Sequence, residues 1–549
     1  MNEIIKKRFF TQLTITQLYL MVGNFLLIFF LIFLSNLCVL PLKNISDFLF
    51  FTFLFLFFAL YRPGWAFLLF VGTIALENIN LAPASFGIAV RPYQFSGALV
   101  ILAMLIRLVA KRLNFSLEKP KWHDLLVILI TAGGFVSALT APDRVLSFKL
   151  SVIFATFAAL YFLVRNYIRD IMDLKKIIPF FLSSSLIIIL YGIWQNIRFI
   201  GGLTSFEVMP GRPNGTFPEA DWLGIYVVLF IALVYAIIFF VIAREHSDRG
   251  NLVPITTRLL RFARKDMFLY IFLTLNYILL ILTVSRSAWL GALAATFVFL
   301  FIILTNLKIN PKDWQWKKLF WNSFGILISG IIAIAIVYFF NLTSFQLFNR
   351  AQSIGTGLQK ITISCSPRAK LLENQRPSSI GDVSELKELG CRYINFEEIK
   401  LEEARGNFIK ETYRDDPNVN IRKEIYKKSW QEIKKNPILG IGWGSIGKAL
   451  GTDERGASLN ASNIFLEVWL GTGLIGLVAF LLLWFYILFR NSANFIKTKD
   501  LEERAFSIFI ITAWFGLTAA NLFNSGIMLG FLWVFIAVSL IEIFRTNSE

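Results

Sequence analysis

Long apolar runs alternate with short polar segments along almost the whole chain. A bilayer-spanning helix needs about 20 mostly apolar residues, because its backbone polar groups must be satisfied within the segment. The pattern predicts an all-α, polytopic transmembrane bundle of about 14 spans. The second and third runs are short and could form a re-entrant pair. The loss of both spans together would leave the number of spans even. The runs cover residues 18–40, 48–61, 65–76, 95–109, 125–139, 146–164, 177–194, 222–242, 267–284, 288–304, 319–340, 464–489, 505–520 and 527–543.

Composition supports the membrane prediction. Of 549 residues, 56% are hydrophobic and 16% are charged, whereas a soluble chain of this length would need more polar surface. The net charge of +18 is compatible with nucleic acid, anionic lipid or phosphate substrates. The sequence contains no nucleic-acid motif, no CxxC pair and no metal-type cluster. We therefore expect no nucleic-acid partner, no metal and no cofactor.

The distribution of Lys and Arg predicts the orientation, because cytoplasmic loops collect these residues. We expect a multi-pass protein of the cytoplasmic (inner) membrane with both termini in the cytoplasm. The first apolar run lacks a small-residue cleavage site and is interpreted as a retained helix. The cation-rich segments alternate with nearly bare ones and begin near Lys6, Lys111, Arg165, Arg244, Lys308 and Arg490.

One long polar segment interrupts this pattern. Residues 341–460 would lie outside as a mostly helical extracytoplasmic subdomain, between helices 1–11 (residues 1–340) and helices 12–14 (residues 461–549). Its own charges do not oppose this, since long segments cross largely regardless of charge. Cys365 and Cys391 within it are either a disulfide in an oxidising compartment or two free thiols.

A helical pattern ends this segment. Ile421, Ile425, Trp430 and Ile433 fall near helical spacing, and Pro437 closes the pattern. The predicted amphipathic helix either lies at the membrane interface or gates access of a substrate.

Three polar clusters lie on the predicted outer face. In the first, residues 212–222, Arg212 is placed to meet an anion, and Glu219 and Asp221 bring carboxylates to the mouth of a span. The alternative is a loop that only anchors the interface through Trp222.

The second cluster is Ser285-Arg286-Ser287, where two apolar runs meet almost without a loop. Arg286 at such a join needs a partner or a ligand, unless it only snorkels to lipid phosphate.

The third cluster spans residues 462–467 and follows residues 437–444, which include Trp443. Glu467 would lie about one helical turn inside a span, where a carboxylate is costly and is a functional candidate. The alternative is an interfacial carboxylate paired with an arginine.

Together these clusters resemble the O-antigen ligase and O-antigen polymerase family of bacterial membrane glycosyltransferases. The layout of many helices with one large late outer loop is also similar. The matching features are the arginine before Gly215-Thr216-Phe217, Ser285-Arg286-Ser287, Gly440-Ile441-Gly442, and Asn463 with Leu466 ahead of Gly473-Leu474-Ile475-Gly476.

The resemblance implies a substrate and a place in the cell envelope. Such enzymes take a glycan from a polyprenyl diphosphate carrier, such as undecaprenyl diphosphate, on the outer face of the membrane. They pass it to a sugar hydroxyl on a glycan or glycolipid acceptor, in polysaccharide or lipopolysaccharide biosynthesis. No nucleotide sugar or metal is generally needed, which agrees with the residues here.

The resemblance also suggests roles for individual residues. Arg212 and Arg286 would hold the charge that builds on the leaving diphosphate. A carboxylate would accept the proton of the acceptor hydroxyl, with Glu219 and Glu467 ranked above Asp221. The substrate-binding candidates are Arg212, Arg286, Asp221, Arg422, Trp443 and Asn463.

One departure from the family pattern concerns the ligase branch. Ligases of the family typically carry a histidine directly before the asparagine of the third cluster, and this chain has Ser462 there. Its two histidines, His123 and His246, fall in predicted cytoplasmic loops. A polymerase is therefore slightly favoured over a ligase. Transfer to a protein acceptor, a glycolipid flippase or transporter, and an inactive relative that only binds lipid-linked glycan are the alternatives.

Overall fold

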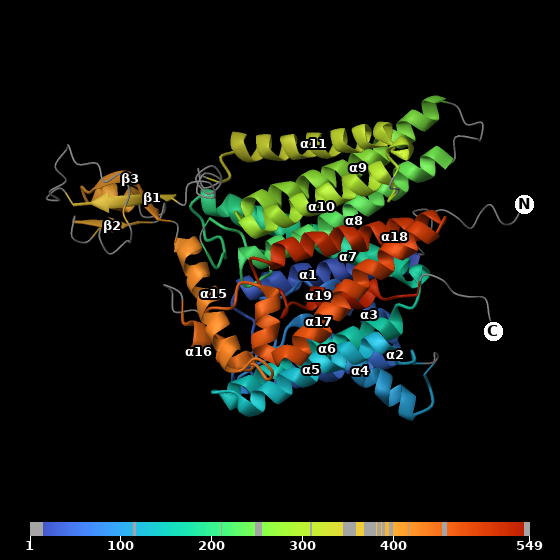
Figure 1. Ribbon diagram of the computed structural model, residues 1–549, viewed down its shortest axis with the longest axis horizontal. Coiled ribbons are helices and arrows are strands. Elements are labelled where there is room, and N and C mark those ends of the chain that lie inside the picture. Colours follow the sequence, from blue (N-terminus) through green and yellow to red (C-terminus); the bar gives the residue numbers. More distant parts are fainter. Residues whose placement is uncertain are drawn as a thin grey trace, which may run out of the picture.

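The computed structural model describes residues 15–113, 117–209, 211–247, 255–307, 310–343, 358–366, 380, 386, 390–394, 399–415, 417–452 and 458–542. Most of these residues lie in helices packed side by side in one bundle, with a small sheet at one end (Figure 1). The helices of the first half are α1 (Ile15–Asn36), α2 (Ile45–Tyr61), α3 (Pro63–Thr73), α4 (Pro92–Val109), α5 (Trp122–Thr140), α6 (Arg144–Tyr167), α7 (Ile171–Ile200) and α8 (Ala220–Ser247). The later helices are α9 (Ile255–Leu282), α10 (Arg286–Thr305), α11 (Trp316–Phe339), α14 (Ile399–Ala404), α15 (Pro417–Lys435), α16 (Ile446–Leu450), α17 (Ile464–Lys497), α18 (Leu501–Asn521) and α19 (Gly530–Ser539).

Each predicted apolar run coincides with a helix of the structure. Among the described residues, nine helices are long and apolar enough to cross a bilayer by length and composition. Shorter apolar helices include α2, α3 and α19. The protein is thus a polytopic helical membrane protein, and the count of about 14 spans and the sidedness of the termini stay predictions.

Several helices begin at side chains that accept otherwise free backbone N–H groups. Asp143 accepts from the N–H of Leu146 before α6, and Asp170 accepts from that of Asp173 before α7. Ser285 accepts from the N–H of Ala288 at the start of α10. Such caps typically contribute about 1 kcal/mol each and define where each helix starts.

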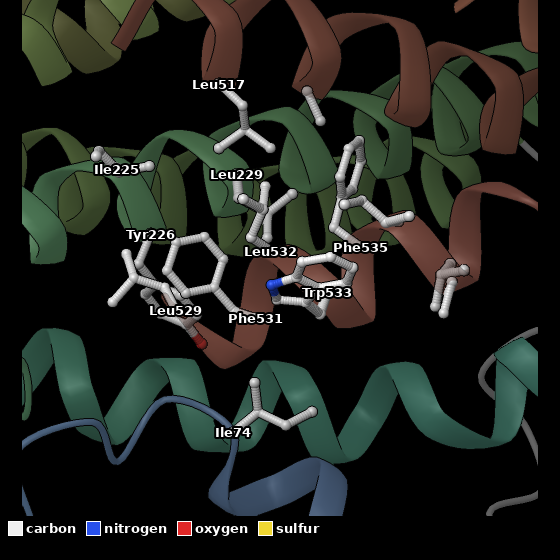
Figure 2. Packing of buried hydrophobic residues seen from close by; sticks show 14 of the residues in the cluster. Ile74, Ile225, Tyr226, Leu229, Leu517, Leu529, Phe531, Leu532, Trp533 and Phe535 are labelled. Carbon is white, nitrogen blue, oxygen red and sulfur yellow. The ribbon is translucent and has the colours of Figure 1, made fainter. Parts of the chain in front are cut away.

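Helix α8 lies at the centre of the bundle. Its spanning window is 89% buried, more than that of any other candidate span in the described residues. Tyr226 of α8 meets Phe531 of α19 with ring centroids 5.3 Å apart, and Leu517 of α18 and Ile74 lie in the same buried cluster (Figure 2). An apolar helix buried on all sides is typical of the inner layer of a membrane bundle.

Helix α17 is broken by a glycine. Gly473 has a φ of +71°, and a Cβ there would lie 2.0 Å from the carbonyl oxygen of Ile438. The freed backbone groups find partners in residues 437–444: Ile441 donates to the carbonyl of Leu470 at 2.8 Å, and Leu474 donates to that of Ile438 at 3.0 Å. A backbone polar group without a partner is costly in an apolar environment, and these bonds supply the partners. They also join the two glycine-containing segments of the family pattern.

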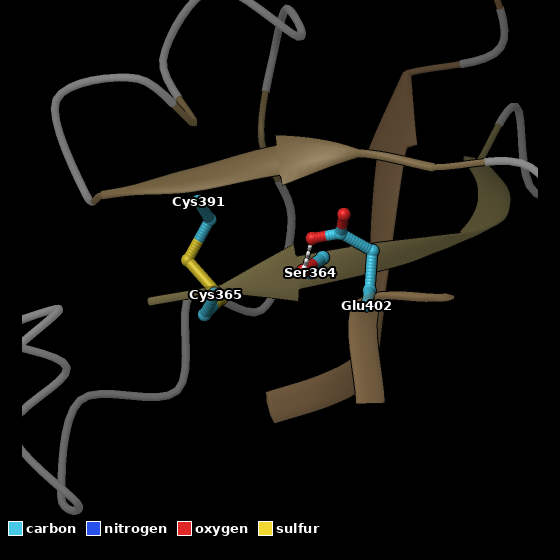
Figure 3. Close-up of a disulfide and its surroundings, with 4 residues drawn as sticks. All are labelled: Ser364, Cys365, Cys391 and Glu402. Carbon is cyan, nitrogen blue, oxygen red and sulfur yellow. Dashed lines mark hydrogen bonds between the residues drawn. A yellow bond between two sulfur atoms is a disulfide. The ribbon is translucent and has the colours of Figure 1, made fainter. Parts of the chain in front are cut away.

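The polar segment contains a three-stranded sheet beside the helices α14, α15 and α16, so the prediction of an all-α chain is wrong for this segment. Strands β1 (Leu358–Cys365), β2 (Cys391–Tyr393) and β3 (Phe408–Asp415) form a three-stranded antiparallel sheet in the order β2-β1-β3. Cys365 lies opposite Cys391 in the register, and the two form a disulfide (Figure 3). The open choice between a disulfide and free thiols is thereby decided for the disulfide.

A buried carboxylate fastens α14 to this sheet. The side chains of Arg392, Ser364 and Asn407 donate to the carboxylate of Glu402 at 2.8, 2.7 and 2.7 Å, and Figure 3 shows the bond from Ser364. These hydrogen bonds, that from Arg392 foremost, lower the pKa of Glu402 to about 2.

Candidate functional site

The first cluster lies in the connection between α7 and α8, which is fastened to its neighbours by hydrogen bonds. The N–H of Gly215 donates to the side chain of Gln195 in α7 at 2.7 Å, and Gly215 itself has a φ of +55°. Thr216 donates its hydroxyl to the carbonyl of Ala75 at 2.6 Å. Because hydrogen bonds to Gln195 and to Ala75 hold this connection in place, Arg212, which lies within it, has a defined position.

Arg212 joins the first cluster to the second. Its Nε donates to the carbonyl oxygen of Thr283 at 3.1 Å, and its Nη2 donates to Oδ1 of Asp221 at 3.1 Å. The Arg212 side chain is 11% exposed, against 30% for Asp221. The guanidinium is therefore largely desolvated and oriented, which strengthens its interaction with an anion.

The second cluster forms the tight turn between α9 and α10. Arg286 is the first residue of α10 and is partly buried. A Cβ on Gly224 of α8 would lie 2.5 Å from the Cβ of Ala288, so α8 packs directly against this turn. Arg286 and the beginning of α8, with Glu219 and Asp221 beside it, thus lie at the same end of the bundle.

The third cluster caps α17. The side chain of Asn463 accepts from the N–H groups of Phe465 and Leu466 at 2.9 and 3.2 Å. Glu467 accepts the N–H of Ala461 at 2.6 Å and is partly buried. This bond ties Glu467 to the turn that precedes α17, so the carboxylate has a structural contact in addition to any chemical role.

The connection between α18 and α19 links the third cluster to the first. The amide of Asn463 donates to the carbonyl of Leu522 at 3.1 Å, and the indole of Trp222 donates to Oδ1 of Asn524 at 3.3 Å. Phe523 is the residue between Leu522 and Asn524, and its ring centroid lies 5.9 Å from the guanidinium of Arg422 in α15. The first and third clusters and Arg422 therefore meet at one connection, and the second cluster joins them through the bond of Arg212 to Thr283.

Two contributors to this arrangement were not among the predicted site residues. The Tyr426 hydroxyl of α15 lies 3.3 Å from the carbonyl oxygens of both Ser462 and Leu522. Leu522 contributes only its backbone carbonyl, and a backbone acceptor leaves no pattern in a sequence. Burial raises the pKa of Tyr426, so its hydroxyl is protonated and can donate at neutral pH.

A buried ion pair supports the same end of the bundle. Glu77 is fully buried and accepts from Arg91 at 2.9 Å, from the Tyr93 hydroxyl at 2.8 Å and from the N–H of Gly530 at 2.7 Å. The N–H of Asn78, the next residue, donates to the carbonyl of Thr216 at 2.7 Å. In the sequence, this ion pair is indicated by Glu77, a single carboxylate at the end of an apolar run.

Trp443 lies apart from this cluster. Its ring stacks on Phe154 with centroids 5.0 Å apart, and a Cβ on Gly471 would lie 2.3 Å from the ring. The side chain is 4% exposed. Packing between α6 and α17 accounts for this tryptophan, and its predicted contact with substrate stays a prediction.

The remaining titratable candidates lie elsewhere. His123 is buried in the first turn of α5, and the side chain of His246 lies outside the described residues. Within the part of the chain that the structure describes, no three His, Cys, Asp or Glu residues are grouped so that they could hold a metal ion.

The fold and the site define a multi-pass helical membrane protein with a cationic site at one end of its bundle. Residues 269–481 match the family model described as O-Antigen ligase. This part of the chain is an O-antigen ligase family domain, which confirms the resemblance seen in the sequence. The domain indicates a membrane protein of the O-antigen ligase or polymerase type, acting in polysaccharide biosynthesis on lipid-linked glycans. No curated protein and no solved structure matches the chain.

The match extends from α9 into α17. It includes Arg286, Arg422, Asn463 and Glu467, whereas Arg212 lies outside it. Arg212 is connected to the matched domain through its bond to Thr283.

Proposed function

We propose that this protein transfers a glycan from a polyprenyl diphosphate carrier to a sugar hydroxyl on the outer face of the cytoplasmic membrane. The observation that carries the proposal is the bond between Arg212 and the carbonyl of Thr283, which brings the two arginine-bearing clusters to one end of the bundle. Both termini would lie in the cytoplasm, since the Lys- and Arg-rich connections occur at the opposite end.

The arginines support binding of the diphosphate. Negative charge grows on this group as the bond to the anomeric carbon breaks, and the diphosphate leaves with the bonding electrons. Arg212 and Arg286 would meet that charge, together with the N-terminus of α10, whose backbone N–H groups favour an anion. Donors that are already in place typically contribute about 3–4 kcal/mol to lowering such a barrier.

A carboxylate completes the reaction. The acceptor hydroxyl attacks the anomeric carbon and gives its proton to the base, for which Glu467 and Glu219 are the candidates. Glu467 already holds the N–H of Ala461 through one oxygen. A glutamine there can keep this bond through its amide oxygen but cannot accept the proton, so the substitution separates the two roles.

Polymerisation is favoured over ligation within this chemistry. Ser462 occupies the position where ligases of the family typically have a histidine, and its N–H donates to the side chain of Asn460 at 2.8 Å. The acceptor would then be the end of a growing glycan. A protein acceptor is a further branch of the same reaction.

The test uses the purified full chain in lipid nanodiscs with a polyprenyl diphosphate-linked glycan. Release of polyprenyl diphosphate and the length of the glycan product are measured for the wild type, Glu219→Gln and Glu467→Gln. We expect release and longer glycans from the wild type, and a loss of about 100-fold or more in one of the two variants. Wild-type rates in both variants would contradict a carboxylate base. In sealed proteoliposomes, movement of intact lipid-linked glycan across the bilayer without release would identify a flippase instead.

A further inference from the structure

An apolar cleft lies between α7 on one side and α8, α18 and α19 on the other. Helices α7 and α18 line it with residues near their beginnings, and α8 lines it with residues of its later part. The cleft therefore lies towards the end of the bundle opposite the arginine clusters, which adjoin the end of α7 and the beginning of α8. Figure 2 labels four of its lining residues, Ile74, Leu229, Phe531 and Phe535.

Polar pairs tie α7 to the other helices on both sides of the cleft. At one end, Lys175 of α7 forms an ion pair with Glu502 in the first turn of α18. At the other end, the hydroxyls of Ser185 in α7 and Tyr226 in α8 lie 2.6 Å apart. The ring of Tyr226 also lies 5.9 Å from that of Phe181, which lines the cleft. The space between the helices is thus part of the packed structure.

The chemistry of the lining selects an amphiphile. Among the described residues that line the cleft, Lys175 and Glu502 are the two polar ones, and the others are Val, Ile, Leu, Ala and Phe. A ligand must therefore be apolar along its length and charged at one end. A purely anionic head at that end would meet Glu502 as well as Lys175. A head that carries both an anion and a cation matches the pair, because each charge finds an opposite partner.

The dimensions agree with a lipid of one leaflet. From Phe240 to Leu229, α8 extends about 16 Å, which is about half the thickness of the hydrocarbon core of a bilayer. Lys175 and Glu502 lie near the beginnings of their helices, where headgroups are expected. From Phe240 to Asp221, α8 extends about 28 Å, so an anion bound at the arginine clusters would lie far from Lys175.

We propose that the cleft binds one acyl chain of a phospholipid whose head carries an ammonium and a phosphate group, as in phosphatidylethanolamine. Lys175 binds the phosphate, and Glu502 accepts from the ammonium. The site is separate from the arginine clusters, and the proposal does not depend on glycan transfer. Because the lipid joins α7 to α18 and fills an apolar space between them, its binding stabilises the folded bundle.

The experiment compares three lipids with identical acyl chains: phosphatidylethanolamine, phosphatidylcholine and phosphatidylglycerol. Each is titrated into the full-length protein in mild detergent, and binding is followed by native mass spectrometry. We expect one phosphatidylethanolamine per chain to bind about tenfold more tightly than the other two lipids. The choline head has no N–H group to donate to Glu502, and the glycerol head has no cation. The unfolding temperature should rise with phosphatidylethanolamine in the same order of preference.

Three variants locate the binding in the cleft. Lys175→Ala should weaken binding of phosphatidylethanolamine about tenfold, and Glu502→Gln should remove its advantage over phosphatidylcholine. Ala236→Phe places a ring among the lining residues and should abolish the tight binding. Lys176→Ala is the matched control, because Lys176 is 60% exposed, pairs with Asp173 and is not among the lining residues. If Ala236→Phe does not fold, the two charge variants decide.

Three results would overturn the proposal. Equal binding of the three lipids, or a preference that Lys175→Ala and Glu502→Gln leave unchanged, would show that this ion pair does not recognise a head. Displacement of phosphatidylethanolamine by a polyprenyl phosphate would assign the cleft to an isoprenoid chain. Absence of any tightly bound lipid would show that the cleft stays empty.

Discussion

The Nε of Arg212 donates a hydrogen bond to the carbonyl oxygen of Thr283 at 3.1 Å, across 71 residues of sequence. Thr283 directly follows α9, in the turn that leads to Arg286 at the start of α10, and Asp221 accepts from the same guanidinium at 3.1 Å. One side chain thus fixes the distance between two loops and remains close to the surface where an anion would bind. Asp221 is paired with Arg212 in the structure, and its predicted contact with substrate stays a prediction.

Replacement of Arg212 by lysine tests this arrangement. A lysine keeps the charge but lacks the planar fork that bonds Thr283 and Asp221 together. We expect kcat for release of polyprenyl diphosphate to fall by about 100-fold or more. Arg198→Lys is the matched control, because Arg198 near the end of α7 stacks on Trp194 at 4.9 Å and belongs to none of the three clusters. Equal rates for Arg212→Lys and the wild type would rule out the geometric role of the guanidinium.

The helices and the shared end of the site were predictable from the sequence because both depend on simple rules. A run of about 20 apolar residues must be helical in a bilayer, so each run became a helix. Helices that cross a membrane alternate in direction, so the sidedness of Arg212, Arg286 and Asn463 followed from counting. Their position at one end of the bundle agrees with a common side, and the side of the membrane that this end faces stays a prediction.

The rest depended on pairings between distant residues. Strand β1 pairs with β3 across more than 40 residues, and its polar alternation gave no apolar run to announce a sheet. The break of α17 at Gly473 depends on the carbonyl of Ile438, which is a backbone group. The pairing of Glu77 with Arg91 depends on how α4 packs, which the sequence pattern does not specify.

The ion pair of Glu77 and Arg91 should stabilise the end of the bundle that holds the site. Removal of one partner leaves a buried charge, which typically costs about 3–5 kcal/mol. We expect Arg91→Met to lower the unfolding temperature in detergent, and the double variant Arg91→Met with Glu77→Gln to recover part of the loss because the remaining charge is gone. Thermal unfolding followed by tryptophan fluorescence measures both. A double variant no more stable than Arg91→Met would argue against this account.

The carboxylate of Glu402 should make the stability of the sheet depend on pH. Its hydrogen bonds lower the folded-state pKa to about 2, from an ordinary value of 4.5. The ionised form therefore stabilises the folded state above about pH 4.5, and this contribution is lost as the pH falls towards 2. We expect amide exchange in β1 and β3, corrected for intrinsic rates, to accelerate at pH 3 relative to pH 6.5. Glu402→Gln should exchange faster at pH 6.5 and respond less to acid, whereas Glu403→Gln, at an exposed neighbouring position, should behave as the wild type. The same acid response in both variants would show that another group titrates.

The break of α17 should depend on Gly473. Its φ of +71° lies in the left-handed region, which costs a residue with a side chain about 1 kcal/mol or more. A methyl group would also lie 2.0 Å from the carbonyl of Ile438, so residues 437–444 would have to move away from α17. We therefore expect Gly473→Ala to destabilise the protein by more than about 2 kcal/mol and to slow glycan transfer, since the bonds of Leu470 and Leu474 hold the segment that precedes the Asn463 cap.

Gly330→Ala in α11 is the matched control, because nothing lies within 4 Å of the added Cβ and alanine favours a helix by about 0.5–1 kcal/mol over glycine. Thermal unfolding of both variants in detergent decides the matter, and a Gly473→Ala protein as stable as Gly330→Ala would mean that α17 tolerates a continuous helix.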